Sequence, residues 1–142
     1  MVSAWVKPLT PGCVRGWWFD PAMTITALGL RTVIYPAPDL DASKAWFSAL
    51  LGATPTFDSP FYVGFDVGGY ELGLRPDIAL TDGALTYWGV EDVAAAVATA
   101  LDAGASVHEQ AQEVGGGIVV ATVRSPQGVV VGFIHHPHFV AR

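Results

Sequence analysis

Charged side chains are scarce in this chain of 142 residues. Asp, Glu, Lys and Arg make up 14% of it, whereas 51% of the residues are apolar. A typical soluble domain carries about a quarter charged residues. Few charges are therefore left to cover the surface, and we expect part of that surface to be buried in a homodimer. The length and the apolar fraction together support one compact domain with a full core.

Basic residues are scarcer still. The chain has seven Lys and Arg against thirteen Asp and Glu, which gives a net charge of −6. Nucleic-acid binding needs a basic face, so this balance argues against a nucleic-acid partner. No apolar run approaches the roughly 20 residues of a membrane-spanning helix, which argues against a membrane. The single cysteine, Cys13, has no partner for an intrachain disulfide, and no secretory signal pattern precedes it. We therefore expect a cytoplasmic protein.

The chain does contain a repeated plan. Residues 30–52 and 84–104 each read as an apolar strand, a short acidic turn and an amphipathic helix that ends near a glycine. Asp39 maps onto Asp92 at an offset of 53 residues, and Gly52 maps onto Gly104 at an offset of 52. Only two copies fit, so the pattern indicates two similar half-domains rather than a solenoid. A site is expected between them.

In the first copy, the strand Leu30–Ala37 is followed by a helix that Asp39 or Asp41 can cap and that Gly52 can end. The apolar side chains of this helix are expected to pack on the sheet; they are Trp46, Phe47, Leu50 and Leu51. Two strands, Phe61–Val67 and Tyr70–Leu74, then form a hairpin around two glycines, Gly68 and Gly69.

The second copy predicts the strand Leu85–Val90 and a helix capped by Asp92 and ended by Gly104. Three further strands are expected at Ser106–Gln110, Ile118–Arg124 and Val129–Ile134. The three glycines 115–117 are read as a hairpin turn in preference to a mobile flap, and residues 125–128 (Ser-Pro-Gln-Gly) as a turn. The fold class is therefore α+β, with the helices on one side of the sheet.

Residues 1–23 do not share this pattern, since their tryptophans, prolines and glycines follow no strand or helix period. Two interpretations stay open for this N-terminal extension. It is either non-native or disordered, with Met23 as the natural start, or an arm whose three tryptophans pack on a partner subunit.

Three stretches together resemble the vicinal oxygen chelate superfamily, which includes glyoxalase I, bleomycin-resistance proteins and extradiol dioxygenases. They are residues 33–52, with Ala-Pro-Asp-Leu and the pair Trp46-Phe47, residues 90–105, with Val-Glu-Asp before the helix, and residues 123–134, with Ser-Pro-Gln-Gly. The resemblance implies a single domain over residues 24–142. Two βαβββ modules, at about 24–80 and 84–138, would form a cup-shaped, incompletely closed mixed sheet with the helices outside.

Catalytic members of that superfamily hold a divalent metal with His, Gln and Glu from strands of both modules. The resemblance places these ligand positions at Thr32, Glu71, Leu85 and Gly132, so that only Glu71 offers a carboxylate. A hard divalent ion needs several oxygen or imidazole donors. We therefore expect no cofactor and no metal ligands, and a bound divalent metal is the less favoured alternative.

The same placement predicts the lining of the cup. The expected ligand-binding residues are Thr32, Ile34, Tyr62, Glu71, Tyr87 and His136. Alternation along the last strand puts His136 inside the cup, although a polar strand end stopped by Pro137 is the plainer interpretation. Glu71 has two interpretations, a hydrogen-bond acceptor or general base in the cup, or an ion pair with Arg75 or Arg31.

Two functions of different class follow. The favoured one is a metal-free protein that holds a small organic molecule in the cup. The alternative is an enzyme of the same superfamily, a lyase, isomerase or dioxygenase, that uses either a metal or acid–base catalysis by Glu71 or His136.

Overall fold

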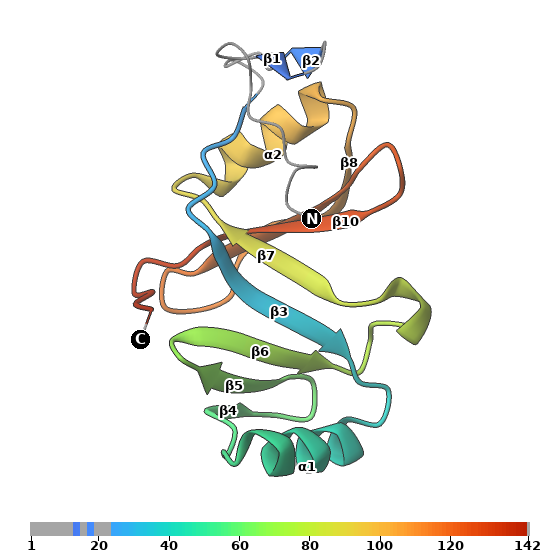
Figure 1. The fold of residues 1–142 in the computed structure, drawn as a ribbon, viewed down its shortest axis with the longest axis vertical. Helices are drawn as coiled ribbons and strands as arrows, with labels where there is room; N and C mark the ends of the chain where they lie inside the picture. Colours follow the sequence, from blue (N-terminus) through green and yellow to red (C-terminus); the bar gives the residue numbers. More distant parts are fainter. Residues whose placement is uncertain (1–12, 15–16, 19–23, 142) are drawn as a thin grey trace.

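The computed structural model describes residues 13–14, 17–18 and 24–141, and Figure 1 shows their arrangement. The first module consists of β3 (Leu30–Pro36), α1 (Leu40–Leu51), β4 (Phe57–Asp58), β5 (Val63–Val67) and β6 (Tyr70–Arg75). The second consists of β7 (Leu85–Gly89), α2 (Val93–Asp102), β8 (Ser106–Glu113), β9 (Val119–Arg124) and β10 (Val130–His135). A 3-10 helix, η3 (Leu80–Asp82), lies between the modules.

Both modules contribute to one mixed, open sheet of eight strands in the order β4-β5-β6-β3-β7-β10-β9-β8. The order is symmetric about the antiparallel pair β3–β7, in which Val33 lies opposite Thr86. In each module the first strand pairs parallel with the last, β3 with β6 and β7 with β10. The α+β fold and the two βαβββ modules are thus confirmed, and the sheet is continuous within one chain.

The two helices lie at opposite ends of the sheet, α1 beyond β4 and α2 beside β8 to β10 (Figure 1). The Asp39 side chain caps α1 by accepting from Ala42 N at 3.1 Å, so of the two predicted caps it is Asp39 that acts. Asp92 caps α2 in the same way. Gly52 ends α1 in the left-handed conformation that favours glycine.

The prediction for the apolar face of α1 is wrong in part. Phe47 and Leu51 pack on the core beneath β5 and β6, and Phe47 stacks on Tyr35. Trp46 is 60% exposed and Leu50 is 62% exposed. The four side chains form two adjacent rows, Trp46 with Leu50 and Phe47 with Leu51. Because α1 lies over one edge of the sheet, only the second row reaches it.

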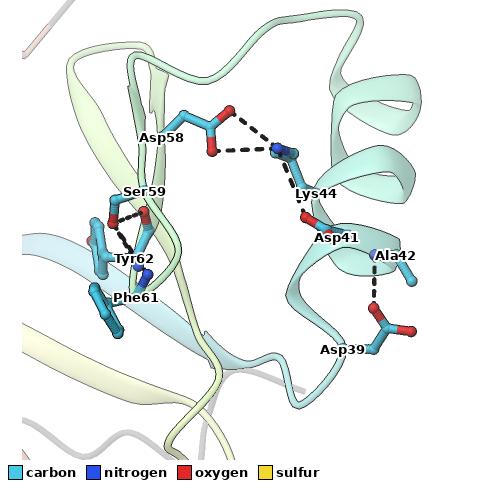
Figure 2. A network of polar contacts seen from close by, with 8 residues as sticks. All are labelled: Asp39, Asp41, Ala42, Lys44, Asp58, Ser59, Phe61 and Tyr62. Carbon is cyan, nitrogen blue, oxygen red and sulfur yellow. Dashed lines mark hydrogen bonds and ion pairs between the residues drawn. The ribbon is translucent and has the colours of Figure 1, made fainter.

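The chain between α1 and β5 also differs from the expectation of a strand from Phe61. A short strand, β4, precedes a turn at residues 59–62, in which Ser59 Oγ accepts from the backbone N–H groups of Phe61 and Tyr62 (Figure 2). Tyr62 therefore lies in a turn rather than in a strand. Lys44 of α1 binds Asp58 of β4 at 3.1 Å and holds the helix against this segment.

The N-terminal extension falls largely outside the described residues. Its described part is an antiparallel pair of two-residue strands, β1 (Cys13–Val14) and β2 (Trp17–Trp18). Packing of its tryptophans lies outside the described residues. In the part of the chain that the structure describes, no helix has the length and apolar character of a membrane span.

Candidate functional site

A cavity of about 470 Å³ lies on the concave face of the sheet, between the two modules. This volume falls within the roughly 300–1,000 Å³ that is usual for small-molecule sites. Residues from both modules line it, including all six that the sequence predicts as ligand-binding: Thr32, Ile34, Tyr62, Glu71, Tyr87 and His136. Their common placement is a fact of the structure, whereas ligand binding by them stays a prediction.

The wall from the first module is built around Tyr62. The turn at Ser59 directs its ring over Gly73 of β6, where a β-carbon would overlap the phenol oxygen. The Tyr62 hydroxyl donates to Glu71 Oε1 at 2.5 Å. Burial raises the pKa of Tyr62 well above its ordinary value, and the nearby Glu71 carboxylate raises it further. Tyr62 is therefore a neutral hydrogen-bond donor at physiological pH.

Glu71 thus has a tyrosine for a partner. Among the described residues, no Lys, Arg or His nitrogen lies within ion-pair distance of its carboxylate, so the predicted pairing with Arg75 or Arg31 is wrong. Arg75 instead binds Asp77 at 2.7 Å and lies 3.6 Å from Glu109. The hydrogen bonds from Arg75 lower the pKa of the Asp77 carboxyl. The predicted alternative, a Glu71 that accepts a hydrogen bond inside the cup, agrees with the geometry.

The wall from the second module repeats this arrangement around Tyr87. Its ring lies against Gly132 of β10, where a β-carbon would be 2.5 Å from Tyr87 Cδ1 and 2.7 Å from the carbonyl oxygen of Thr86. Tyr87 is 4% exposed. Burial raises its pKa to about 12, and the negative charge of Glu109 acts in the same direction.

Strand register relates the two walls. Gly73 lies beside Ile34 of β3, and Gly132 lies beside Tyr87 of β7. Ile34 and Tyr87 are separated by the repeat offset, so Gly73 and Gly132 occupy equivalent positions in the two modules. The counterpart of Glu71 is consequently Val130, two residues before Gly132. Each module thus places a tyrosine ring on the glycine of its last strand.

These residues do not fit a divalent metal. Of the positions assigned to ligands, Leu85 and Gly132 have no side-chain donor, and Glu71 already binds Tyr62. Within the described ranges, no group of three or more His, Cys, Asp or Glu side chains gathers as a metal site would require. The tyrosine rings also occupy the space into which side chains at Gly73 and Gly132 would project.

The sequence did not reveal the part that Arg31 takes in the cavity. It lines the wall near the start of β3, and its guanidinium carbon lies 3.9 Å from the centre of the Phe139 ring. Phe139 belongs to the segment after β10, and it also packs on Tyr70. The sequence does not indicate that Arg31 lies in the cavity, because regular alternation from Thr32 would place it on the opposite face of the sheet.

The histidines take different positions. His136 follows the last residue of β10 and lines the cavity, and its Nδ1 accepts from the backbone N–H of His138 at 3.3 Å. His138 is exposed and does not line the cavity. His108, on the edge strand β8, lies 2.9 Å from Thr122 Oγ1 through its Nδ1.

Residues 29–133 match the Glyoxalase/Bleomycin resistance protein/Dioxygenase superfamily. The chain belongs to this superfamily. The resemblance drawn from the sequence is therefore confirmed over most of the chain. No curated protein matches it.

Several solved structures share the fold. A member from Vibrio splendidus 12B01 is 19% identical, with a TM-score of 0.54 over 75% of this chain and 97% of that one. Methylmalonyl-CoA epimerase from Mycobacterium tuberculosis is 17% identical, with a TM-score of 0.61 over 79% and 90% of the two chains. The Mn(II)-bound glyoxalase from Novosphingobium aromaticivorans is 20% identical, with a TM-score of 0.60 over 82% and 41%. At these identities the likeness shows the fold alone.

Proposed function

We propose that this glyoxalase-superfamily protein binds a small organic molecule in the cavity between its modules and that it does so without a metal. The observation that carries the proposal is the pair of tyrosine rings, Tyr62 on Gly73 and Tyr87 on Gly132. Together with Ile34 and the other apolar side chains of the cavity, they form walls suited to a flat or partly apolar ligand.

Several polar groups of this cavity are engaged with one another. Tyr62 donates to Glu71, and Arg75 is bound by Asp77 and Glu109. Pre-arranged polar groups orient a ligand inside an apolar pocket, while the apolar walls supply most of the affinity. Such a pocket suits a binding protein, because a ligand can be held without a free general acid and a free general base.

An acid–base enzyme is the second candidate, and the short contact between Tyr62 and Glu71 favours it. A carboxylate 2.5 Å from a phenol oxygen can accept a proton from, or return it to, a substrate held beside both groups. His136, at the rim, offers a further titratable group. The methylmalonyl-CoA epimerase, which has a similar fold, is an enzyme, and this supports an acid–base enzyme as the second candidate.

Metal analysis of the purified protein, combined with thermal unfolding in the presence of Ni²⁺, Zn²⁺ or Mn²⁺, tests the metal-free part of the proposal. We expect substoichiometric metal and no large stabilisation by any of the three ions. Stoichiometric metal, or a large increase in Tm, would contradict it.

A thermal-shift screen of small organic molecules tests the binding part, with an Ile34→Trp variant that fills the cavity as control. Compounds that stabilise the wild type and leave the Ile34→Trp protein unchanged support the proposal. A screen without such compounds counts against it. A hit that turns over in the presence of wild type but not of Glu71→Gln would favour the enzyme.

We also propose that the domain, residues 24–142, forms a homodimer. The low charge content and the exposure of Trp46 and Leu50 on α1 support this.

A further inference from the structure

We propose that Arg31 binds the anionic group of the cavity's ligand, which we infer to be an organic molecule with a carboxylate or similar oxyanion. This assignment rests on the small-molecule function proposed above and adds the chemical class of the ligand. It depends on three features of Arg31: a bulge that turns it inward, a glycine that makes room for it, and a guanidinium without an anionic partner.

A break in strand pairing directs Arg31 into the cavity. Leu30 lies opposite Trp88 and Thr32 lies opposite Tyr87, so Arg31 is an extra residue between two consecutive pairs. Such a bulge turns a side chain away from the face that regular alternation would give it. As a result Arg31 and Thr32, adjacent in sequence, both line the cavity.

Gly89, at the end of β7, provides the space that the arginine occupies. A β-carbon there would be 2.7 Å from Arg31 Nε and 3.1 Å from Arg31 Cγ and Cζ. Gly89 does not have a positive φ, so its backbone conformation does not call for glycine. The Arg31 side chain therefore accounts for the glycine at this position, because it occupies the space that a side chain at residue 89 would need.

The charge of Arg31 is not neutralised by the chain. Across the described residues, no carboxylate lies within ion-pair distance of its guanidinium and no acceptor takes a hydrogen bond from it, and its contact is with the Phe139 ring. The other arginine of the cavity, Arg75, differs, because Asp77 and Glu109 bind it.

The chemistry of a guanidinium then indicates the ligand. An aromatic ring contacts the face of the group, whereas the N–H donors lie in its plane and match the two oxygens of a carboxylate. Two carboxylates also line this cavity, and both have partners: Glu71 accepts from Tyr62, and Glu109 lies 3.6 Å from Arg75. An anion from the ligand therefore meets one unpaired cation, with the apolar walls beyond it for the rest of the molecule.

Calorimetric titration with three probes that share one bicyclic body tests this assignment: 2-naphthoate, 2-naphthamide and 2-naphthylmethylammonium. We expect wild type to prefer the naphthoate over the amide by about tenfold or more, and this preference to fall at high salt. Arg31→Gln should abolish the preference and Arg31→Lys should retain part of it. Arg124→Gln, which makes the same change in net charge outside the cavity, should retain it fully.

Gly89→Ala provides an independent variant, because it keeps the charge and displaces the side chain. We expect it to reduce the preference for naphthoate, with Tm showing that the protein is folded; should it not fold, the Arg31→Gln result decides. Equal binding of all three probes, or an unchanged preference in Arg31→Gln, would overturn the assignment while leaving small-molecule binding intact. Preference for the ammonium would assign the site to the carboxylates of the cavity, Glu71 and Glu109, and to a cationic ligand instead. Binding of no probe would overturn the ligand class. The proposed function has separate tests, the metal analysis and the screen with the Ile34→Trp control, so its failure can be told apart from that of the Arg31 assignment.

Discussion

The hydroxyl of Tyr62 lies over Gly73 and donates to Glu71, two residues earlier on the same strand. The glycine and the tyrosine are therefore interdependent, because a side chain at residue 73 and the ring of Tyr62 would occupy the same space. Tyr87 and Gly132 are related in the same way in the second module. In both modules the tyrosine ring fills the space beside the glycine and forms part of the cavity wall.

Gly73→Ala should lower the free energy of unfolding by about 1–3 kcal/mol, because the added methyl group overlaps the Tyr62 ring. In a Tyr62→Ala background the same change should cost markedly less. A double-mutant cycle from urea unfolding measures the difference. Additive effects of the two changes would show that the ring does not depend on the glycine.

Gly132→Ala should cost more than Gly73→Ala. Its β-carbon would be 2.7 Å from the carbonyl oxygen of Thr86 as well as close to the Tyr87 ring, and a backbone atom cannot move aside as a side chain can. Replacement of Tyr87 by Ala should therefore rescue Gly132→Ala only in part. Full rescue in urea unfolding would contradict this account of the second wall.

Stability should decrease at high pH through Tyr87. Both folded and unfolded states keep this phenol protonated below about pH 10. Above that pH the unfolded state loses the proton first, because the folded pKa is raised to about 12, and the unfolded state is then favoured. We expect a loss on the order of 2 kcal/mol as pH rises through this interval.

Urea unfolding of wild type and Tyr87→Phe, at neutral pH and at about pH 11, measures this contribution. The variant should lose less stability than wild type between the two conditions. Tyr62, whose pKa is also raised, contributes with the same sign in both proteins. Identical losses in the two proteins would show that burial of Tyr87 does not shift its titration.

Asp39→Ala should lower the free energy of unfolding by about 1 kcal/mol, because it removes the side-chain cap of α1. Asp41→Ala is a matched control two residues further along the chain. The Asp41 carboxylate lies 4.0 Å from the Lys44 ammonium, which is a weak contact. It should change stability by less than about 0.5 kcal/mol. Equal effects of the two changes would contradict the assignment of the cap.

Trp46→Glu should convert the proposed homodimer to monomer if α1 contributes to the interface, while the unfolding free energy of the monomer changes little at so exposed a position. Light scattering coupled to size-exclusion chromatography measures the mass of both proteins. A monomeric wild type would contradict the proposed dimer, and a dimeric variant would exclude this helix from the interface.

The repeat and its motifs were sufficient to predict the two modules and the family, and for the helix ends they gave Asp92 and Gly52 correctly. They left Asp39 and Asp41 as alternatives for the cap of α1, and they placed the end of α2 at Gly104, one residue after its C-cap Ala103. These features depend on local patterns, such as Asp before a helix and glycine after it, which hold wherever the chain folds. Alternation along the strand from Leu85 also placed Tyr87 in the cup, because it fixes the face of a side chain. Glu71 was placed there by the family resemblance.

The details of the walls could not be predicted in this way. Tyr62 lies in a turn whose geometry depends on Ser59, and Arg31 points inward because of a bulge in the pairing with β7. The exposure of Trp46 depends on how far α1 extends over the sheet edge. Each of these depends on contacts between segments distant in sequence, which periodicity does not report.

The most direct test of the central claim is calorimetric titration of the best screening hit into wild-type protein, with and without excess EDTA. The account predicts the same Kd in both conditions for wild type and no binding to Ile34→Trp. Binding that disappears with EDTA and returns with an added divalent ion would contradict it.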